Sequence, residues 1–287
     1  MGAEFCSIPY NSCNLGSINL TKCVDDNRKF NLQKFKTLVN NSVRFLDNMI
    51  TVNKLPLKEI EEVTKGVRSV GLGVMGFSDC LYKLGLKYNS EEAYEFANIL
   101  FDEMYARARN ISHDLAQEKG AYKLIKGSTW ESRPVRNSNF LSIAPTGSIS
   151  FLANVSSGIE PNFGLVYTRT TFNGDEYYVV NEVFKEELIK RNLYNDNLLE
   201  KIANNHGSCI GISEIPKDMQ DIFVTAHDIS PEDHVEMVGT IQQWIDLSTA
   251  KTVNLPSEAT VEDVMDVYML AWKQRIKGIT ISNGRLM

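Results

Sequence analysis

Apolar side chains recur at helical spacing in the first third of the chain. In the segment 31–52 they fall on one helical face, at Leu32, Phe35, Leu38, Val39, Leu46, Met49 and Ile50. This periodicity predicts an amphipathic helix with one face packed inward. LKEIEEVTKGV (57–67) predicts a second helix, and Asn89 with Glu92 marks the capped start of a long helix that stops at Gly120.

The last third of the chain holds two more capped helix starts. Ser230 and Thr260 are each followed three residues later by an aspartate, ahead of periodic apolar segments. Trp244 and Trp272 lie in these segments with Met and Leu neighbours, so we expect both rings in the core.

Short apolar runs between the helices predict strands. NLGSINL (14–20) alternates, NFLSIA (139–144) is bounded by a basic loop and a proline, and YYVVNEVF (177–184) indicates a strand or a helix start. KTVNLP (251–256) and GITIS (278–282) predict two later strands. Because helices and strands alternate, we predict an α/β architecture with largely parallel strands.

Three glycines, Gly71, Gly73 and Gly76, match the spacing GxGxxG. A dinucleotide-binding loop requires a preceding strand and an acidic residue about 20 positions on. Here the preceding stretch is predicted as a charged helix. We therefore favour glycine-mediated close packing over nucleotide binding.

Composition and charge narrow the function classes. The 287 residues are 43% hydrophobic and carry a net charge of −6, from 30 Lys and Arg against 36 Asp and Glu. Such a chain can bury a large core, and it has no overall positive field for nucleic acid or an anionic membrane. No apolar run approaches the ~20 residues needed to cross a bilayer. We expect neither a nucleic-acid nor a membrane partner.

Five cysteines occur at irregular spacing, without the paired motifs of zinc sites, so we predict no metal site, a reducing compartment and a cytoplasmic location. Most lone cysteines are small buried hydrophobes. Cys13 differs because SCN is a polar turn ahead of a strand, where a thiol could be accessible. Glu4 and Cys6 lie close in sequence, and a carboxylate could exchange protons with a thiol.

The loop APTGSIS (144–150) follows a predicted strand. Its hydroxyls, its glycine and the helix start just beyond suit phosphate binding through backbone N–H groups. A simple turn is an equal alternative, because Pro, Thr, Gly and Ser are all turn formers. In the next loop, SSGIEPNF (156–163), Glu160 could be catalytic, but we favour a structural role. For His227 and His234 we favour capping or core roles over metal binding.

Taken together, the motifs resemble the large catalytic subunit of ribonucleotide reductase, most closely its adenosylcobalamin-dependent class II branch. The stretches that carry the resemblance are SCNLGSINL, RFLDNMITVNKLPLKEIEE, GLGVMGFSD, LSIAPTGSIS, SSGIEPNF, VTAHDISPEDHV, STAKTVNLP and KGITI. They occur in the order of the family from residue 4 to about 282. Their order, more than any single motif, makes the resemblance specific.

The resemblance implies the second half of a ten-stranded α/β barrel with helices outside. Residues 1–287 would form a single domain, the C-terminal half-barrel, in which residues 1–20 supply the tail of the finger loop and the first strand. The family reduces ribonucleotides with a thiyl radical that removes the ribose 3′ hydrogen. A thiol pair then supplies two electrons at the 2′ carbon, and a glutamate shuttles protons.

Residue by residue, Cys13 matches one member of the reducing pair and Glu4 matches the glutamate that follows the radical cysteine. Pro145, Thr146, Gly147, Ser148 and Ile149 match the loop that holds the substrate phosphates. The radical cysteine should lie two positions before Glu4, where this sequence has Gly2. Cys6 lies on the other side of Glu4 and does not replace that thiol.

From these departures we expect the isolated chain to be inactive, and a second polypeptide to supply the first half-barrel and the radical cysteine. A natural split gene and a shortened form of a longer chain both fit. A thioredoxin-like protein would be the reductant. Three alternatives stay open: a diphosphate or a triphosphate substrate, the cobalamin branch or the branch with a separate metal subunit, and an enzyme component or a catalytically inactive nucleotide-binding scaffold.

Overall fold

The computed structural model describes residues 8–170, 173–174 and 176–283. Its named strands are β1 (Asn14–Asn19), β2 (Val70–Met75), β3 (Val166–Thr170), β4 (Glu176–Val180), β5 (Thr252–Leu255) and β6 (Thr280–Asn283). Its helices are α1 (Leu32–Val52), α2 (Lys58–Val67), α3 (Phe77–Leu84), α4 (Glu91–Lys119), α5 (Gly147–Ala153), α6 (Glu182–Lys190), α7 (Asp196–Asn204), α8 (Lys217–Ile222), α9 (Pro231–Gln242) and α10 (Val261–Lys273), with short 3₁₀ turns η1 (Leu20–Cys23) and η2 (Ala226–Asp228).

A parallel strand array organises the molecule. β1 pairs in parallel with β2. The extended segment 139–144 lies on the other side of β2 through the parallel bridge Leu72↔Leu141, and the segment 247–255 follows through the parallel bridge Ile143↔Thr249. β5 is the end of that segment and pairs in parallel with β6. The order is therefore β1, β2, 139–144, 247–255 and β6, which confirms the predicted α/β class with parallel strands.

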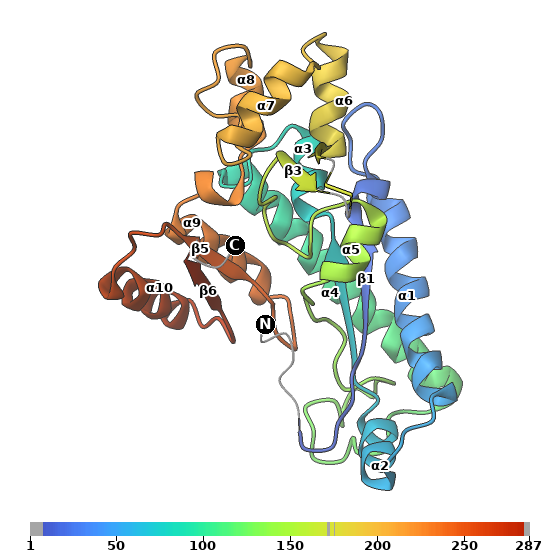
Figure 1. Cartoon of the computed structure of the whole chain (residues 1–287). Coiled ribbons are helices and arrows are strands. Elements are labelled where there is room, and N and C mark those ends of the chain that lie inside the picture. The colour runs from blue at the N-terminus through green and yellow to red at the C-terminus, as the bar shows by residue number, and fades with distance from the viewer. Residues whose placement is uncertain (1–7, 171–172, 175, 284–287) are drawn as a thin grey trace.

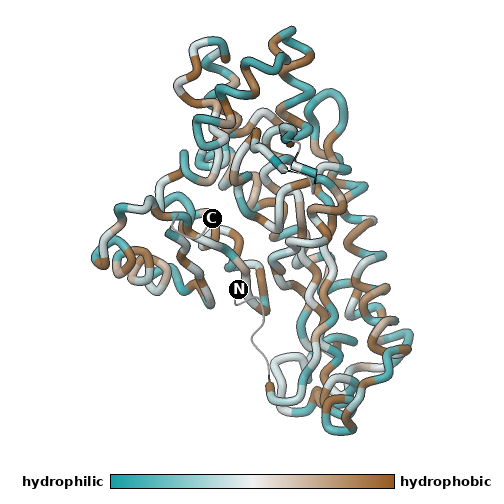
Figure 2. Tube along the Cα trace, viewed as in Figure 1, coloured by the Kyte–Doolittle hydropathy of each residue, from teal (hydrophilic) through white to brown (hydrophobic). Residues whose placement is uncertain are grey.

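Helices α1 and α4 cover one face of this array (Figure 1). Gly16 faces α1, since a Cβ built there would lie 3.4 Å from the Leu46 side chain. The main core is formed between these elements and includes Phe35 and Phe101, both fully buried. In Figure 2 the loop that leads into α1 is hydrophilic, whereas the two helices carry many hydrophobic positions. The face of β1 that turns away from α1 is not covered by these two helices.

Two smaller clusters flank the main core. The antiparallel pair β3 and β4 packs with α6, α7 and α8 around Phe184 and Phe223, and Figure 1 shows these helices gathered at one end of the molecule. The second cluster joins α9, α10, β5 and β6 around Val253 and Val267. Both clusters follow from the amphipathic periodicity of their helices.

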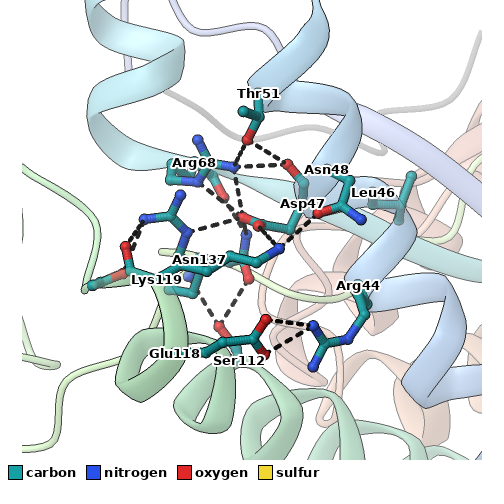
Figure 3. A network of polar contacts seen from close by, with 12 residues as sticks. Arg44, Leu46, Asp47, Asn48, Thr51, Arg68, Ser112, Glu118, Lys119 and Asn137 are labelled. Atoms are coloured by element: carbon teal, nitrogen blue, oxygen red, sulfur yellow. Dashed lines mark hydrogen bonds and ion pairs between the residues drawn. The ribbon is translucent and has the colours of Figure 1, made fainter.

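A buried polar network ties the outer helices together (Figure 3). Asp47 of α1 is fully buried, and its Oδ1 lies 2.7 Å from Arg68 Nη2. Arg136 and Lys119 also face this carboxylate, at 3.4 and 3.8 Å. Asn137 donates to Asp47 Oδ1 at 3.1 Å and to the Arg68 carbonyl at 3.0 Å. One carboxylate thereby joins α1, the end of α2, the end of α4 and the segment before the strand 139–144.

Several sequence predictions change in detail. Ser90, not Asn89, caps α4, because its side chain accepts the N–H of Ala93. The prediction that Trp272 lies in the core is wrong: its relative exposure is 72%, while Val267 and Ala271 form the buried face of α10. Apolar side chains occur on two faces of this helix, so periodicity alone does not tell which face packs. Trp244 is partly buried against the main core, as expected.

Candidate active site

Cys13 directly precedes β1, on the face that turns away from α1. Side chains alternate along a strand, so Cys13, Leu15 and Ser17 share that face, while Gly16 faces α1. A Cβ built on Gly71 of β2 would lie 2.5 Å from Leu15 Cδ2, 2.9 Å from Ser142 Cβ and 3.4 Å from Cys13 Sγ. Gly71 thus allows side chains from both neighbouring strands to approach across β2. This confirms the predicted role of the glycine run in close packing, although the run forms a strand where none was predicted.

The Cys13 thiol is held in a partly buried setting. Ser69 Oγ donates to Cys13 Sγ at 3.8 Å, and the Cys13 side chain is of intermediate exposure. Burial raises the pKa of Cys13 to about 12; the Ser69 hydrogen bond opposes this rise and the charge of Asp246 adds to it. The group is therefore a protonated thiol at neutral pH, suited to giving up a hydrogen together with electrons rather than to attack as a thiolate.

The predicted phosphate loop lies beside the same strand. A hollow of about 270 Å³ is lined by Leu15, Gly16 and Ser17 of β1 together with Ala144, Thr146, Gly147, Ser148 and Ile149. Cys13 is four residues from Ser17, a separation of about 13 Å along an extended strand. The loop therefore adjoins β1, and Cys13 directly precedes this strand without lining the hollow itself.

Thr146 gives this loop an uncommon conformation. Its φ is 58°, in the left-handed region that a β-branched residue rarely adopts. A threonine at a helix N-cap commonly accepts an N–H of the first turn, but Thr146 Oγ1 instead accepts the N–H of Gly158 at 2.7 Å. The N–H groups of a first helical turn have no partner within the helix. Because the cap hydroxyl is used elsewhere, these donors stay available at the hollow.

The loop 156–160 packs against the phosphate loop and supports it. Ser157 and Ser150 share a hydrogen bond of 2.9 Å between their hydroxyls. Glu160 Oε1 accepts the N–H of Thr252 at 2.7 Å, and Oε2 forms an ion pair with Lys251 at 2.7 Å. Both carboxylate oxygens of Glu160 are used in holding the loop, which agrees with the structural role favoured from the sequence.

His234 is fully buried and does not face a metal-binding cluster; no group of three or more His, Cys, Asp or Glu suited to a metal occurs among the described residues. Its Nε2 lies 3.0 Å from the Ala226 carbonyl and its Nδ1 lies 2.9 Å from Lys251 Nζ. Burial, with Lys251 adding to the effect, lowers the pKa of His234 to about 3. The core role predicted for this histidine is confirmed.

Asp246 lies at the N-terminal end of the strand array and joins two of its segments. Its carboxylate accepts the N–H groups of Phe140 and Leu141, each at 2.7 Å, and so holds the segment 139–144 against the start of the segment 247–255. Burial raises the pKa of Asp246 to about 6, although these backbone N–H groups oppose the rise.

Glu4 and Cys6 lie outside the described residues, so their predicted roles stay predictions. Sequence reasoning missed Ser69 beside Cys13, Lys251 behind Glu160, and Asp246. The signal for Lys251 was a single lysine in the otherwise uncharged stretch STAKTVNLP, just ahead of a strand. No helix among the described residues is long and apolar enough to span a membrane.

A comparison with family models matches residues 3–134 and 129–282 to the family described as "Ribonucleotide reductase, barrel domain". Among curated proteins, a vitamin B12-dependent ribonucleoside-diphosphate reductase of Thermoplasma acidophilum is 41% identical over 276 residues, covering 96% of this chain and 36% of the relative. The protein of the same name from Mycobacterium tuberculosis (strain CDC 1551) is 39% identical over 275 residues, covering 96% of this chain and 39% of the relative.

More distant relatives include the alpha subunit of a ribonucleoside-diphosphate reductase from Chlamydia muridarum, 30% identical over 304 residues, with 92% of this chain and 29% of the relative covered. Among solved structures, the class Id ribonucleotide reductase alpha subunit of Actinobacillus ureae superposes with a TM-score of 0.80 at 22% identity, covering 95% of this chain and 50% of that chain. This likeness shows a shared fold. The chain spans less than two fifths of the length of these three curated relatives.

Proposed function

Because this chain belongs to the ribonucleotide reductase barrel-domain family, we propose that it supplies part of the active site of an enzyme that converts ribonucleoside di- or triphosphates to 2′-deoxyribonucleotides. The observation that supports this most is that the loop residues 146–149 line one hollow with residues 15–17 of β1, the strand that Cys13 directly precedes. A nucleotide whose phosphates lie against Thr146, Gly147 and Ser148 could extend its ribose along this strand toward the thiol.

In the proposed reaction, Cys13 is one member of the thiol pair. A thiyl radical on a further cysteine removes the ribose 3′ hydrogen, and the 2′ hydroxyl leaves as water after protonation. The thiol pair gives two electrons and closes to a disulfide, while the 3′ hydrogen returns to the sugar. Cys13 enters this sequence as a thiol because burial raises its pKa to about 12. Glu4 is proposed as the group that carries protons.

The loop would bind phosphate through backbone donors. The first-turn N–H groups of α5 are not used by the Thr146 hydroxyl, which accepts from Gly158. Ser148 is an exposed residue of the same turn and carries a further hydroxyl donor. Such neutral donors suit a phosphate group without requiring a lysine.

We propose adenosylcobalamin as the cofactor, on the names of the relatives in Thermoplasma and Mycobacterium. Ile149 lines the hollow, and with Phe151 and Leu152 of the same helix it is exposed, at 46%, 62% and 83%; these side chains offer apolar surface on which a large ring system could pack. When bound, the cofactor would supply the radical. The remainder of the barrel, in the same or in a second polypeptide, would supply the partner of Cys13 and the radical cysteine, and a thioredoxin-like protein would reduce the disulfide.

The test is Cys13→Ser in the complete enzyme, with the remainder of the barrel present. We expect turnover to fall by about 1,000-fold or more, because an alcohol cannot form the disulfide, while nucleotide affinity changes by less than about twofold. Cys209→Ser is the matched control, since Cys209 is buried in the core of the α6–α8 cluster and should leave turnover near that of the parent. Retained turnover in Cys13→Ser would overturn the proposed role.

A further inference from the structure

We propose that the ion pair between the partly exposed Glu160 and the buried Lys251 positions the loop 145–149 without touching the substrate. The inference rests on the proposed function only in calling this loop a phosphate site. The coupling between the pair and the loop stands on contacts within this chain and can be measured without any nucleotide.

Lys251 is anchored on three sides. Its side chain has no exposed surface, and its Nζ lies 2.7 Å from Glu160 Oε2 and 2.9 Å from His234 Nδ1. Nζ also donates to the carbonyl of Thr252. An ammonium group has three hydrogens, and these contacts account for all three. The head group is therefore fixed in one place by partners from three segments of the chain.

The hydrogen bonds also assign the tautomer of His234. Its Nε2 faces the Ala226 carbonyl, which can only accept, so Nε2 carries the proton. Nδ1 is then the acceptor for the Lys251 ammonium. A neutral imidazole in this tautomer completes the shell around Lys251, and the contact joins α9 to the segment 247–255.

Glu160 connects the fixed ammonium group of Lys251 to the loop 156–160. Its Oε1 accepts the N–H of Thr252, and its own N–H donates to the Ser157 carbonyl at 2.8 Å. The carboxylate and the backbone turn are thus held as one unit against the strand segment. A carboxylate that accepts both a backbone N–H and a buried ammonium has little freedom to rotate.

Two contacts then lead from this turn to the phosphate loop. The N–H of Gly158 donates to Thr146 Oγ1, and the Ser157 hydroxyl contacts the Ser150 hydroxyl. The residues they hold, Thr146 and Ser150, are the two ends of the first turn of α5, where the Ser150 N–H donates to the Thr146 carbonyl at 2.8 Å. The left-handed φ of Thr146 is strained for a β-branched residue and persists only when its surroundings fix it.

The closest alternative is that the pair contributes only to global stability. The two ideas differ in where the effect appears. If the pair positions the loop, its loss should loosen the Thr146–Ser150 turn locally. If it contributes only to stability, all slowly exchanging amides should respond together, because they report on global unfolding.

The experiment is amide hydrogen exchange of the full chain, without nucleotide, for the parent and for Lys251→Met. We expect the amides of Ser150 and Gly158 to exchange about tenfold or more faster, while amides of β1 and β2 keep their parent rates. Lys277→Met is the matched control, because Lys277 Nζ donates to the carbonyls of residues 245–247, at the other end of the same strand segment. We expect it to leave the amides of Ser150 and Gly158 unchanged.

Glu160→Gln provides a second variant should Lys251→Met fail to fold, since glutamine keeps an acceptor for the Thr252 N–H but loses the charge. Parent exchange rates at Ser150 and Gly158 in the folded variant, or a uniform acceleration across the chain, would overturn the proposal. In the complete enzyme we expect a raised KM and a kcat close to that of the parent. A complete enzyme that reduces no nucleotide would count against the proposed function, while the exchange result would still decide the positioning role.

Discussion

The hydroxyl of Thr146 accepts a hydrogen bond of 2.7 Å from the backbone N–H of Gly158, and this contact joins two loops twelve residues apart in the sequence. It fixes a threonine whose φ is 58° and leaves the first-turn N–H groups of α5 uncapped. The same contact therefore holds one wall of the hollow and leaves the cap of α5 without a side-chain acceptor.

Thr146→Val should loosen this arrangement. Valine has a similar shape but no acceptor, so the buried Gly158 N–H would lose its partner at a cost of about 1–3 kcal/mol. We expect a lower free energy of unfolding and weaker binding of nucleoside diphosphate, measured by urea denaturation and by titration calorimetry. Thr146→Ser keeps the hydroxyl and should stay close to the parent in both measurements. Equal behaviour of the two variants would show that the hydrogen bond is unimportant.

Gly71→Ala should disturb the strand surface next to Cys13. The added Cβ would lie 2.5 Å from Leu15 Cδ2 and 3.4 Å from Cys13 Sγ, so neighbouring side chains must move. Overpacking of this kind costs about 1–3 kcal/mol, which urea denaturation would detect. Gly147→Ala is the control, because nothing lies within 4 Å of its added Cβ, and its stability should stay within about 0.5 kcal/mol of the parent.

Asp47→Asn should be among the most destabilising polar substitutions in the main core. It removes the carboxylate that faces Arg68, Arg136 and Lys119 and leaves these cations without their shared counter-charge (Figure 3). Loss of one partner of a buried ion pair costs about 3–5 kcal/mol.

The comparison for this variant is Glu118→Gln, which breaks the half-exposed pair between Glu118 and Arg44. Exposed pairs contribute about 0–1 kcal/mol, so this variant should unfold at nearly the denaturant concentration of the parent. Similar losses in the two variants would contradict the central place of Asp47 in the network.

His234 should make the protein sensitive to acid. Burial and Lys251 lower its pKa from 6.5 to about 3, so between these values the unfolded chain binds a proton that the folded chain does not. The free energy of unfolding has its full value for this group above pH 6.5. It decreases as the pH falls toward 3, by up to about 5 kcal/mol. The measurement is the free energy of unfolding at about pH 7 and about pH 4, on either side of the unfolded pKa.

His234→Gln removes the titrating group, and the drop in stability between the two pH values should be smaller in this variant than in the parent. Asp246 acts in the opposite direction, because its raised pKa lowers stability as the pH rises from about 4 to about 6. That contribution is present in both proteins and cancels in the difference. An equal drop in the two proteins would show that His234 stays neutral or is already charged in both states.

Local patterns in the sequence carry much of the secondary structure. The start of α10 follows from Thr260 and Asp263, whose side chains form a reciprocal capping box. The start of α9 follows from Ser230, which accepts the N–H of Asp233. Such caps involve only neighbouring residues, so the sequence is enough to recognise them. The loop 144–150 and the unusual setting of Cys13 were also visible as short polar stretches beside predicted strands.

The arrangement of the site could not be predicted from these local patterns alone. The stretch GLGVMG contributes to β2, where Gly71 lies between Leu15 and Ser142, two residues that are distant in the sequence. Trp272 has the spacing of a core residue, yet the helix packs through its other apolar face. Both outcomes depend on which neighbour is present, and helical or strand periodicity does not contain that information.

By itself, then, the sequence determined the elements, their caps and the motifs that place the chain in its family. Only the tertiary structure decided that Thr146 lines a hollow with β1, that Ser69 adjoins the Cys13 thiol, and that Lys251 pairs with Glu160 behind the loop. The physical reason is range: caps and periodicity arise from contacts between residues a few positions apart, whereas burial, pKa and ion pairing depend on segments that the fold brings together from across the chain.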